Sequence, residues 1–365
     1  MKVNFKNAFS KKKVAIILTV FVLIAVMIIS NPDIKEFFSA KDAIKLTFQT
    51  GVEYDMVSYG KDMLLVNNES IFAFDKSGRE AWSIVAPTAT PYTQVSGDYI
   101  MLADINGKTL KTFKKEKVIT QLETENKIIC AKVNNNGNIA VATDQLGYKG
   151  MVTLYNKNGK EVFKWHSGSG YIGDIDISSK KRIAVAQIMT DKEKVYSKIV
   201  SINPGSDKEP ETIAEVEGIV MKLKYRDNGK LVAMSDKGVF CFKKSGKLDF
   251  STDFGGRIPS KCNIENENNM VFAFDSGQNS TILESYSASG KLRGSFDAKS
   301  EVSAMDVNGE CIVAVKRDSI VRINPKGAVK EEIKANKDVK GIRIFQNRSK
   351  ILVVGDRNAE LIKIR

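Results

Sequence analysis

The sequence predicts an all-β fold built from eight similar units, and three observations predict it. A four-residue apolar core recurs eight times along the chain. A hairpin-like phrase centred on a glycine recurs between these cores. The last repeat lacks one strand, and the beginning of the chain can supply it.

The apolar cores follow one another at intervals of 36, 39, 44, 48, 40, 41 and 39 residues. A near-continuous apolar run bounded by turn residues is what a strand buried on both faces requires. A period near 40 residues is typical of the blades of a β-propeller. The cores are LLVN at Leu64, IMLA at Ile100, IAVA at Ile139, IAVA at Ile183, LVAM at Leu231, VFAF at Val271, IVAV at Ile312 and ILVV at Ile351.

Each unit has room for four antiparallel strands. The unit that begins at Glu301 divides into EVSAMDV, CIVAVKR, IVRINP and AVKEEIK, with short turns between them. The glycine phrase is then the hairpin between the third and fourth strands, and its clearest copy is MVTLYNKNGKEVFKWH at 151–166. Two units depart from it: 114–116 lacks the glycine, and 204–207 forms a longer loop in a unit that also carries an insert at 190–194.

The two ends of the chain complement each other. Residues 339–365 supply only three strands, and AIKLTFQ at 43–49 can supply the fourth. Such pairing removes the free sheet edge that an open ring would expose. We therefore expect an eight-bladed β-propeller over residues 43–365, closed by N- and C-terminal strands. Seven blades is the alternative, if the unit of Ile100 is absorbed elsewhere.

The N-terminal segment predicts a membrane anchor. Residues 1–13 form a basic tail with five lysines and no acid, and residues 14–30 are a continuous apolar run. As a helix this run would span about 25 Å, enough to cross the hydrocarbon core. The positive-inside rule then puts the N-terminus in the cytoplasm and the propeller outside, with residues 31–42 as a stalk. A cleaved signal peptide is the rival, but no small-residue cleavage site follows the run.

Composition argues against several classes of chemistry. The net charge of +13 suits an anionic surface, yet the lysines are scattered among carboxylates without an aromatic-interleaved basic stripe, so we expect no nucleic-acid partner. The four cysteines never pair in sequence, and there is one histidine. No hydrolase, phosphate-binding or metal-ligand motif is present, so we expect no catalytic residue and no cofactor. Asp174 and Asp176 alternate on one strand face; they could ligate a cation, but pairing with lysines is the simpler interpretation.

The repeat resembles that of quinoprotein-type (PQQ-like) β-propellers, whose blades carry a turn glycine followed by a tryptophan. The resemblance rests on the phrases at 154–165, ending in Trp165, and 74–82, ending in Trp82, and covers roughly residues 43–365. It implies the fold; no set matching the family's quinone or calcium ligands can be placed on this chain. The layout of anchor and propeller also resembles a bacterial family of membrane-anchored β-propellers, which implies a location and a shape but no activity.

One cluster is a candidate for contact with a partner. Trp165, His166 and Tyr171 flank Ser167-Gly168-Ser169-Gly170, the expected crossover between two blades. Propeller crossovers lie on one rim of the ring, where an aromatic patch suits a partner; alternatively, Trp165 wedges between neighbouring blades. We expect a membrane-anchored binding or scaffolding module for a protein or envelope component. The alternatives are a quinone-dependent or other envelope enzyme and an envelope sensor.

Overall fold

The structure, a computed structural model, describes residues 44–46, 54–192, 194–206, 208–277, 279–335, 339–355 and 359–364. Residues 44–365 form a compact unit. Throughout the described residues the secondary structure is β-strand, and no helix there is long and apolar enough to cross a membrane. The predicted tail, anchor and stalk at 1–13, 14–30 and 31–42 lie outside the described residues.

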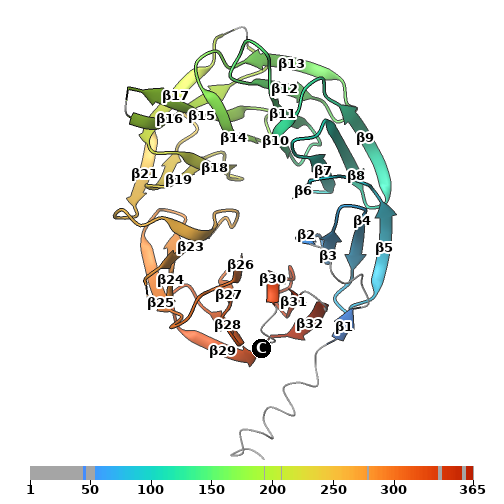
Figure 1. Cartoon of the computed structure of the whole chain (residues 1–365), viewed down its shortest axis with the longest axis vertical. Helices are drawn as coiled ribbons and strands as arrows, with labels where there is room; N and C mark the ends of the chain where they lie inside the picture. Colours follow the sequence, from blue (N-terminus) through green and yellow to red (C-terminus); the bar gives the residue numbers. More distant parts are fainter. Residues whose placement is uncertain are drawn as a thin grey trace, which may run out of the picture. The chain divides into compact units, whose positions relative to one another are not determined.

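The strands form eight four-stranded antiparallel sheets, here called blades 1 to 8, arranged around a ring (Figure 1). Blade 1 contains β2 (Asp55–Tyr59), β3 (Asp62–Val66), β4 (Ser70–Phe74) and β5 (Glu80–Val85). Blade 2 contains β6 (Pro91–Ser96), β7 (Tyr99–Asp104), β8 (Thr109–Lys114) and β9 (Lys117–Glu123). Blade 3 contains β10 (Ile128–Val133), β11 (Ile139–Thr143), β12 (Met151–Tyr155) and β13 (Glu161–His166). Blade 4 contains β14 (Tyr171–Ile177), β15 (Ile183–Asp191), β16 (Lys194–Ile202) and β17 (Glu211–Glu217).

Blade 5 contains β18 (Val220–Tyr225), β19 (Leu231–Ser235), β20 (Gly238–Phe242) and β21 (Leu248–Asp253). Blade 6 contains β22 (Pro259–Asn263), β23 (Asn269–Asp275), β24 (Thr281–Ser287) and β25 (Leu292–Asp297). Blade 7 contains β26 (Ala304–Asn308), β27 (Cys311–Val315), β28 (Ser319–Ile323) and β29 (Val329–Lys334). Blade 8 contains β30 (Val339–Ile344), β31 (Lys350–Gly355), β32 (Ala359–Lys363) and β1 (Ile44–Leu46).

Blade 8 closes the ring with strands from both ends of the chain. β1 pairs antiparallel with β32, placing Ile44 opposite Leu361 and Leu46 opposite Ala359. The predicted closure and the count of eight blades are confirmed, and the seven-bladed alternative is wrong because Ile100 begins the apolar core of a complete blade of its own. In every blade the first strand lies nearest the centre of the ring (Figure 1).

The predicted apolar cores all lie in the second strand of a blade. In β11, for example, all five residues are buried, because the strand packs against a neighbouring blade on each face. The hydrophobic core of the ring is therefore divided into eight clusters, one for each seam between neighbouring blades. Each blade depends on both of its neighbours for burial.

The hairpin between the third and fourth strands has the geometry that its glycine predicted. Gly159 has φ of 80°, and its N–H donates to Asn156 O at 2.9 Å. The Asn156 side chain accepts hydrogen bonds from the N–H groups of Asn158 and Lys160. In blade 2, where the glycine is absent, Lys115 itself adopts φ of 49°, a left-handed conformation that costs a side chain about 1–2 kcal/mol.

The antiparallel order gives the ring two different rims. The turn rim carries the hairpins between first and second and between third and fourth strands. The crossover rim carries the hairpins between second and third strands and the connections from one blade to the next. Hydrogen bonds join neighbouring turns across the turn rim, such as Asn134 Nδ2 to Ser178 O at 2.9 Å and Arg182 Nη1 to Lys244 O at 3.0 Å.

Candidate functional site

The crossover rim of blades 3 to 6 carries a cluster of exposed apolar side chains, here called the apolar arc. Each of these side chains belongs to a loop of the crossover rim or to one of the first two residues of a strand that begins at this rim. Among the described residues, the other exposed large apolar side chains lie on fourth strands, and none lies in the turns of the turn rim. Five of these fourth-strand residues lie within the first two positions of a strand that leaves the turn rim: Val118, Val162, Leu248, Leu292 and Val329. The apolar arc consists of Leu146, Tyr148, Tyr171, Val195, Ile219, Met221 and Ile258.

Aromatic residues form one end of the apolar arc. The rings of Tyr148 and His166 lie 4.5 Å apart, and Lys149 Nζ lies 4.5 Å from the centre of the Tyr171 ring. Lys149 Nζ also donates a hydrogen bond to the Tyr171 hydroxyl at 3.1 Å. Tyr171 is 60% exposed and Leu146 is 95% exposed. This surface offers aromatic faces, an aliphatic side chain and one ammonium group to solvent.

Two of the three predicted contact residues lie on this surface. His166 and Tyr171 are exposed, whereas Trp165 is half-buried and packs against the hydrophobic cluster between blades 3 and 4. Leu146 and Tyr148 are also exposed on this surface, although no motif in the sequence marks them. The feature of the sequence that could have indicated their exposure is the presence of two large apolar residues in the otherwise polar, glycine-containing loop at 144–150.

A buried serine holds the crossover beside this patch in place. Ser167 is fully buried; its hydroxyl donates to Gly170 O at 2.5 Å and accepts from Gln187 Nε2 at 2.6 Å. The Ser167 carbonyl accepts from Lys149 N–H at 2.8 Å. Hydrogen bonds to a buried hydroxyl fix the backbone on both sides of it. These hydrogen bonds hold the short loop between His166 and Tyr171 in one conformation.

Buried charged residues lie on the inner strands of blades 3 and 4. Lys132 in β10 donates from Nζ to the Tyr92 hydroxyl at 2.8 Å and lies 4.0 Å from Asp174 Oδ1. Asp174 Oδ2 accepts the N–H of Leu223, one blade further along the ring, at 2.7 Å. Both carboxylate oxygens of Asp174 are thus engaged by neighbouring blades.

The same chain of charges continues into blades 5 and 6. Asp176 Oδ2 accepts the N–H of Tyr225 at 2.5 Å. Lys222 and Lys224 lie 3.5 and 3.0 Å from the two carboxylate oxygens of Glu265. Together with Lys132 and Asp174, these groups form a neutral set of three cations and three anions.

The pKa values in this network follow from burial and pairing. Burial raises the pKa of Asp176 to about 6, although the Lys224 ammonium group opposes the shift. Burial also raises the pKa of Asp174 against the opposing charge of Lys132. Loss of water would raise the pKa of Glu265, but Lys224 and Lys222 outweigh it and lower the pKa to about 2.

Similar contacts join other blades. Asp306 Oδ2 accepts the N–H of Ile344 at 2.8 Å, and Gln94 Oε1 accepts the N–H of Val133 at 2.8 Å. In each case an inner-strand side chain accepts a main-chain N–H from the inner strand of the next blade. The function of Asp174 and Asp176 that the structure supports is therefore to join blades. Among the described residues, no group of three or more His, Cys, Asp or Glu side chains could hold a metal ion.

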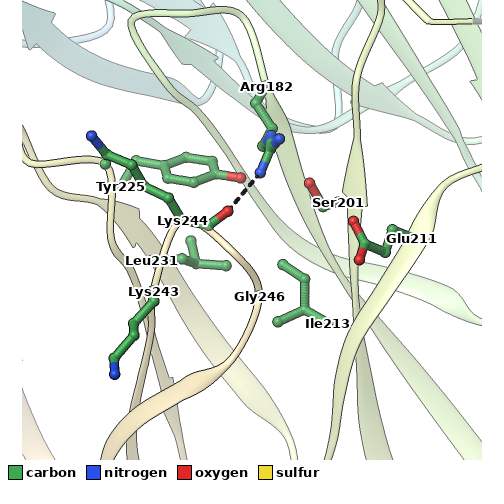
Figure 2. A pocket seen from close by; sticks show the side chains of 10 residues that line it. Arg182, Ser201, Glu211, Ile213, Tyr225, Leu231, Lys243, Lys244 and Gly246 are labelled. Carbon is green, nitrogen blue, oxygen red and sulfur yellow. Dashed lines mark hydrogen bonds between the residues drawn. The ribbon is translucent and has the colours of Figure 1, made fainter.

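Two small cavities lie at blade seams. One, of about 20 Å³, lies between blades 4 and 5 on the turn rim; Figure 2 shows Arg182 reaching across it to the carbonyl of Lys244 while the Lys243 side chain points away. The other, of about 90 Å³, lies between blades 7 and 8 beside Ile320 and Val353. Both are far smaller than the roughly 300–1,000 Å³ of typical small-molecule sites.

The sequence of the chain matches one family model over residues 34–364, described as "Family of unknown function (DUF5711)". The chain belongs to this family. No curated protein matches the chain. The matched range includes all of the described propeller.

Solved structures confirm the fold of this family member. BamB from Moraxella catarrhalis is similar with a TM-score of 0.56 and 10% identity over 88% of this chain and 98% of that one. The C-terminal WD40 domain of Sif2 has a TM-score of 0.62 at 13% identity, over 88% and 99% of the two chains. Sqt1 from Chaetomium thermophilum, solved bound to the N-terminus of ribosomal protein L10, has a TM-score of 0.58 at 11% identity, over 88% and 100%.

Proposed function

We propose that this protein is a membrane-anchored, extracytoplasmic binding module that holds a protein partner on the apolar arc. The observation that carries the proposal is that the described loops of the crossover rim hold four exposed large apolar side chains, Leu146, Tyr148, Ile219 and Ile258, whereas the described turns of the turn rim hold none. Large exposed apolar patches on a folded protein mark interaction sites. Aromatic residues such as Tyr148 and Tyr171 are enriched at such interfaces.

The comparisons support the binding part of this proposal. Sqt1 is a protein of similar fold that was solved with a terminal segment of another protein bound to it. The inner-strand charges are mutually paired, and the two cavities at blade seams are small, so the rim is the surface that supports a function best.

The membrane part of the proposal rests on residues 1–30. Five lysines precede an apolar run long enough to cross a bilayer, with the propeller following on the other side. The test of sidedness is an added exposed cysteine on the crossover rim, Asn68→Cys, in the full chain, compared with the unsubstituted chain and its four native cysteines. A membrane-impermeant maleimide should label it in intact cells. Protection until the cells are lysed would reverse the proposed topology.

The PQQ-like assignment of the repeat is part of the same proposal. The turn glycine followed by Trp82 or Trp165 supports it, and the fold shared with BamB is compatible with it. Adding pyrroloquinoline quinone and calcium to the full chain should leave absorbance and thermal stability unchanged. A clear shift of either would favour a quinone-dependent enzyme instead.

Site-specific cross-linking tests the partner surface. A photo-reactive amino acid placed at Leu146 or Ile258 of the full chain in its own cells should give the same adduct. The matched position on the turn rim is Ser289, which is exposed and polar. Equal adducts from all three positions, or none from the apolar arc, would contradict the proposed docking surface.

A further inference from the structure

Positive charge is distributed unevenly between the two rims. Lysines that are scattered among carboxylates along the sequence gather in space on one edge of the ring. Among the described residues between strands, the turn rim carries 18 Lys and Arg against 8 Asp and Glu. The crossover rim carries 9 Lys and Arg against 6 Asp and Glu, again counting only described residues that lie between strands. The excess of cations therefore lies on the turn rim.

Most of these cations are exposed and form no ion pair with another described residue. Fifteen of the 18 are exposed, and only Arg79 and Lys243 among those form salt bridges with described residues, to Asp75 and Asp249. The thirteen others are Lys61, Lys76, Lys115, Lys157, Lys160, Lys180, Lys181, Lys208, Lys244, Lys247, Lys291, Lys326 and Arg348.

The unpaired cations are densest on blades 3 to 5. The turns at 156–160, 178–182 and 243–247 carry exposed lysines, and none of these three turns contains an acid. The turns of blades 4 and 5 lie side by side, because Arg182 Nη1 donates to Lys244 O. Adjacent like charges repel one another unless an anionic partner or salt compensates them.

The direction of β1 shows which rim receives the N-terminal segment. β32 is the third strand of blade 8, so it runs from the crossover rim to the turn rim. β1 pairs antiparallel with β32 and therefore begins, at Ile44, on the turn rim. The described ring therefore begins, at Ile44, on its basic edge.

We infer that the turn rim of blades 3 to 5 docks on the anionic lipid headgroups of the membrane that anchors the chain. The inference rests on the proposed membrane anchor and deepens it by assigning the ring an orientation. Lysines near an anionic bilayer each contribute attraction that falls off within a Debye length. Thirteen residues, 31 to 43, separate the apolar run from Ile44 in the sequence, so their contour length is at most about 45 Å. The apolar arc then faces away from the membrane, toward the partner.

Hydrogen exchange of the full chain in lipid nanodiscs tests the docking. Discs of equal parts phosphatidylglycerol and phosphatidylcholine should slow exchange in the turns at 178–182 and 243–247, compared with discs of phosphatidylcholine alone. The crossover-rim loop at 144–150 should exchange equally in both. The difference should disappear at about 1 M salt, where the Debye length is about 3 Å.

A charge-reversal variant provides the second arm. Lys157→Glu, Lys180→Glu and Lys244→Glu place one reversal on each of three blades. Each lysine near an anionic surface raises the equilibrium constant for docking about fivefold. Loss of three such lysines should therefore lower the ratio of docked to undocked protein about 100-fold or more. The matched control reverses Lys127, Lys237 and Lys299, exposed lysines of the crossover rim, and should keep the protection.

Each remaining outcome contradicts the inference in a different way. Equal exchange in both kinds of disc at low salt overturns the docking. Protection of the turn rim by a soluble polyanion in phosphatidylcholine discs, without protection in anionic discs, assigns the surface to a polymer instead of lipid. Extraction of the full chain from membranes by alkaline carbonate overturns the anchor itself, and the docking with it.

Discussion

Asp174 in β14 accepts a hydrogen bond from the main-chain N–H of Leu223 in β18, with oxygen and nitrogen 2.7 Å apart. The bond joins blade 4 to blade 5 across 49 residues of sequence, and the same carboxylate lies 4.0 Å from Lys132 of blade 3. One buried side chain thus contacts both neighbouring blades. Seams between blades are held by such polar contacts as well as by apolar packing.

Asp174→Ala should therefore lower the free energy of unfolding by about 3–5 kcal/mol, because it leaves the buried Lys132 ammonium and the Leu223 N–H without this partner. Urea denaturation measures the loss. The matched control is Asp98→Ala on the surface, whose 3.6 Å ion pair with Lys114 is exposed and which should change stability by at most about 1 kcal/mol. Equal losses in the two variants would contradict a special function of Asp174.

Asp176→Asn should change how stability depends on pH. Burial raises the pKa of Asp176 from an ordinary 3.8 to about 6, so the folded chain holds this proton more tightly than the unfolded chain. As pH rises from about 4 to about 6, deprotonation of Asp176 lowers the free energy of unfolding of the wild-type protein by about 3 kcal/mol. Above this range the contribution of Asp176 no longer changes with pH. Asparagine carries no such proton.

The free energy of unfolding of Asp176→Asn, relative to wild type, should thus rise by about 3 kcal/mol between about pH 4 and pH 7. Denaturation curves at several pH values measure this difference. A difference that stays constant over the range would show that Asp176 has no raised pKa. A difference that falls with pH would show that pairing with Lys224 outweighs burial.

The two tryptophans should differ in their contribution to stability. Trp82 is buried in the cluster between blades 1 and 2, whereas Trp165 is half-buried at the edge of the cluster between blades 3 and 4. Trp82→Ala should cost about 3–5 kcal/mol and Trp165→Ala about 1–3 kcal/mol. Chemical denaturation followed by circular dichroism measures both. A loss at Trp165 near zero would mean that it does not wedge the seam.

Alanine substitutions at two turn glycines should distinguish the cost of a strained backbone conformation from the cost of a steric clash. Gly246 has φ of 79° and open space where a side chain would be, so Gly246→Ala should cost about 1 kcal/mol. Gly159 has φ of 80°, but its added Cβ would lie 2.9 Å from Thr120 Cγ2 and 3.1 Å from Leu122 Cδ2 of the preceding blade. Gly159→Ala should therefore be the more destabilising in thermal denaturation. Equal losses would mean that the turn of blade 3 shifts freely.

Much of the architecture could be predicted from the sequence because it is encoded locally. Runs such as IAVA at Ile139 and Ile183 signal strands buried on both faces, and glycine phrases signal hairpins. The closure by β1 followed from counting strands in the last unit. The sequence also predicts that the turn at Lys115 departs from the glycine phrase, but it does not show that this lysine adopts the left-handed conformation.

The contacts between blades could not be predicted in the same way. The sequence predicts that Asp174 and Asp176 pair with lysines, and Asp174 lies 4.0 Å from Lys132. The main-chain partners of the two aspartates, Leu223 and Tyr225, lie 49 residues away and leave no periodic signal. The apolar arc and the basic turn rim likewise exist only in the folded structure. Their residues come from several blades, and only the ring brings them to one edge.

The pairing of β1 with β32 also has a mechanical consequence. Tension applied through residues 1–43 reaches the ring first at three residue pairs, Ile44 with Leu361 to Leu46 with Ala359. A pull along the strand axis loads these pairs together in shear, whereas a sideways pull separates them one after another. The strand that completes the ring is thus the first to bear force, and the direction of that force decides how long the ring stays closed.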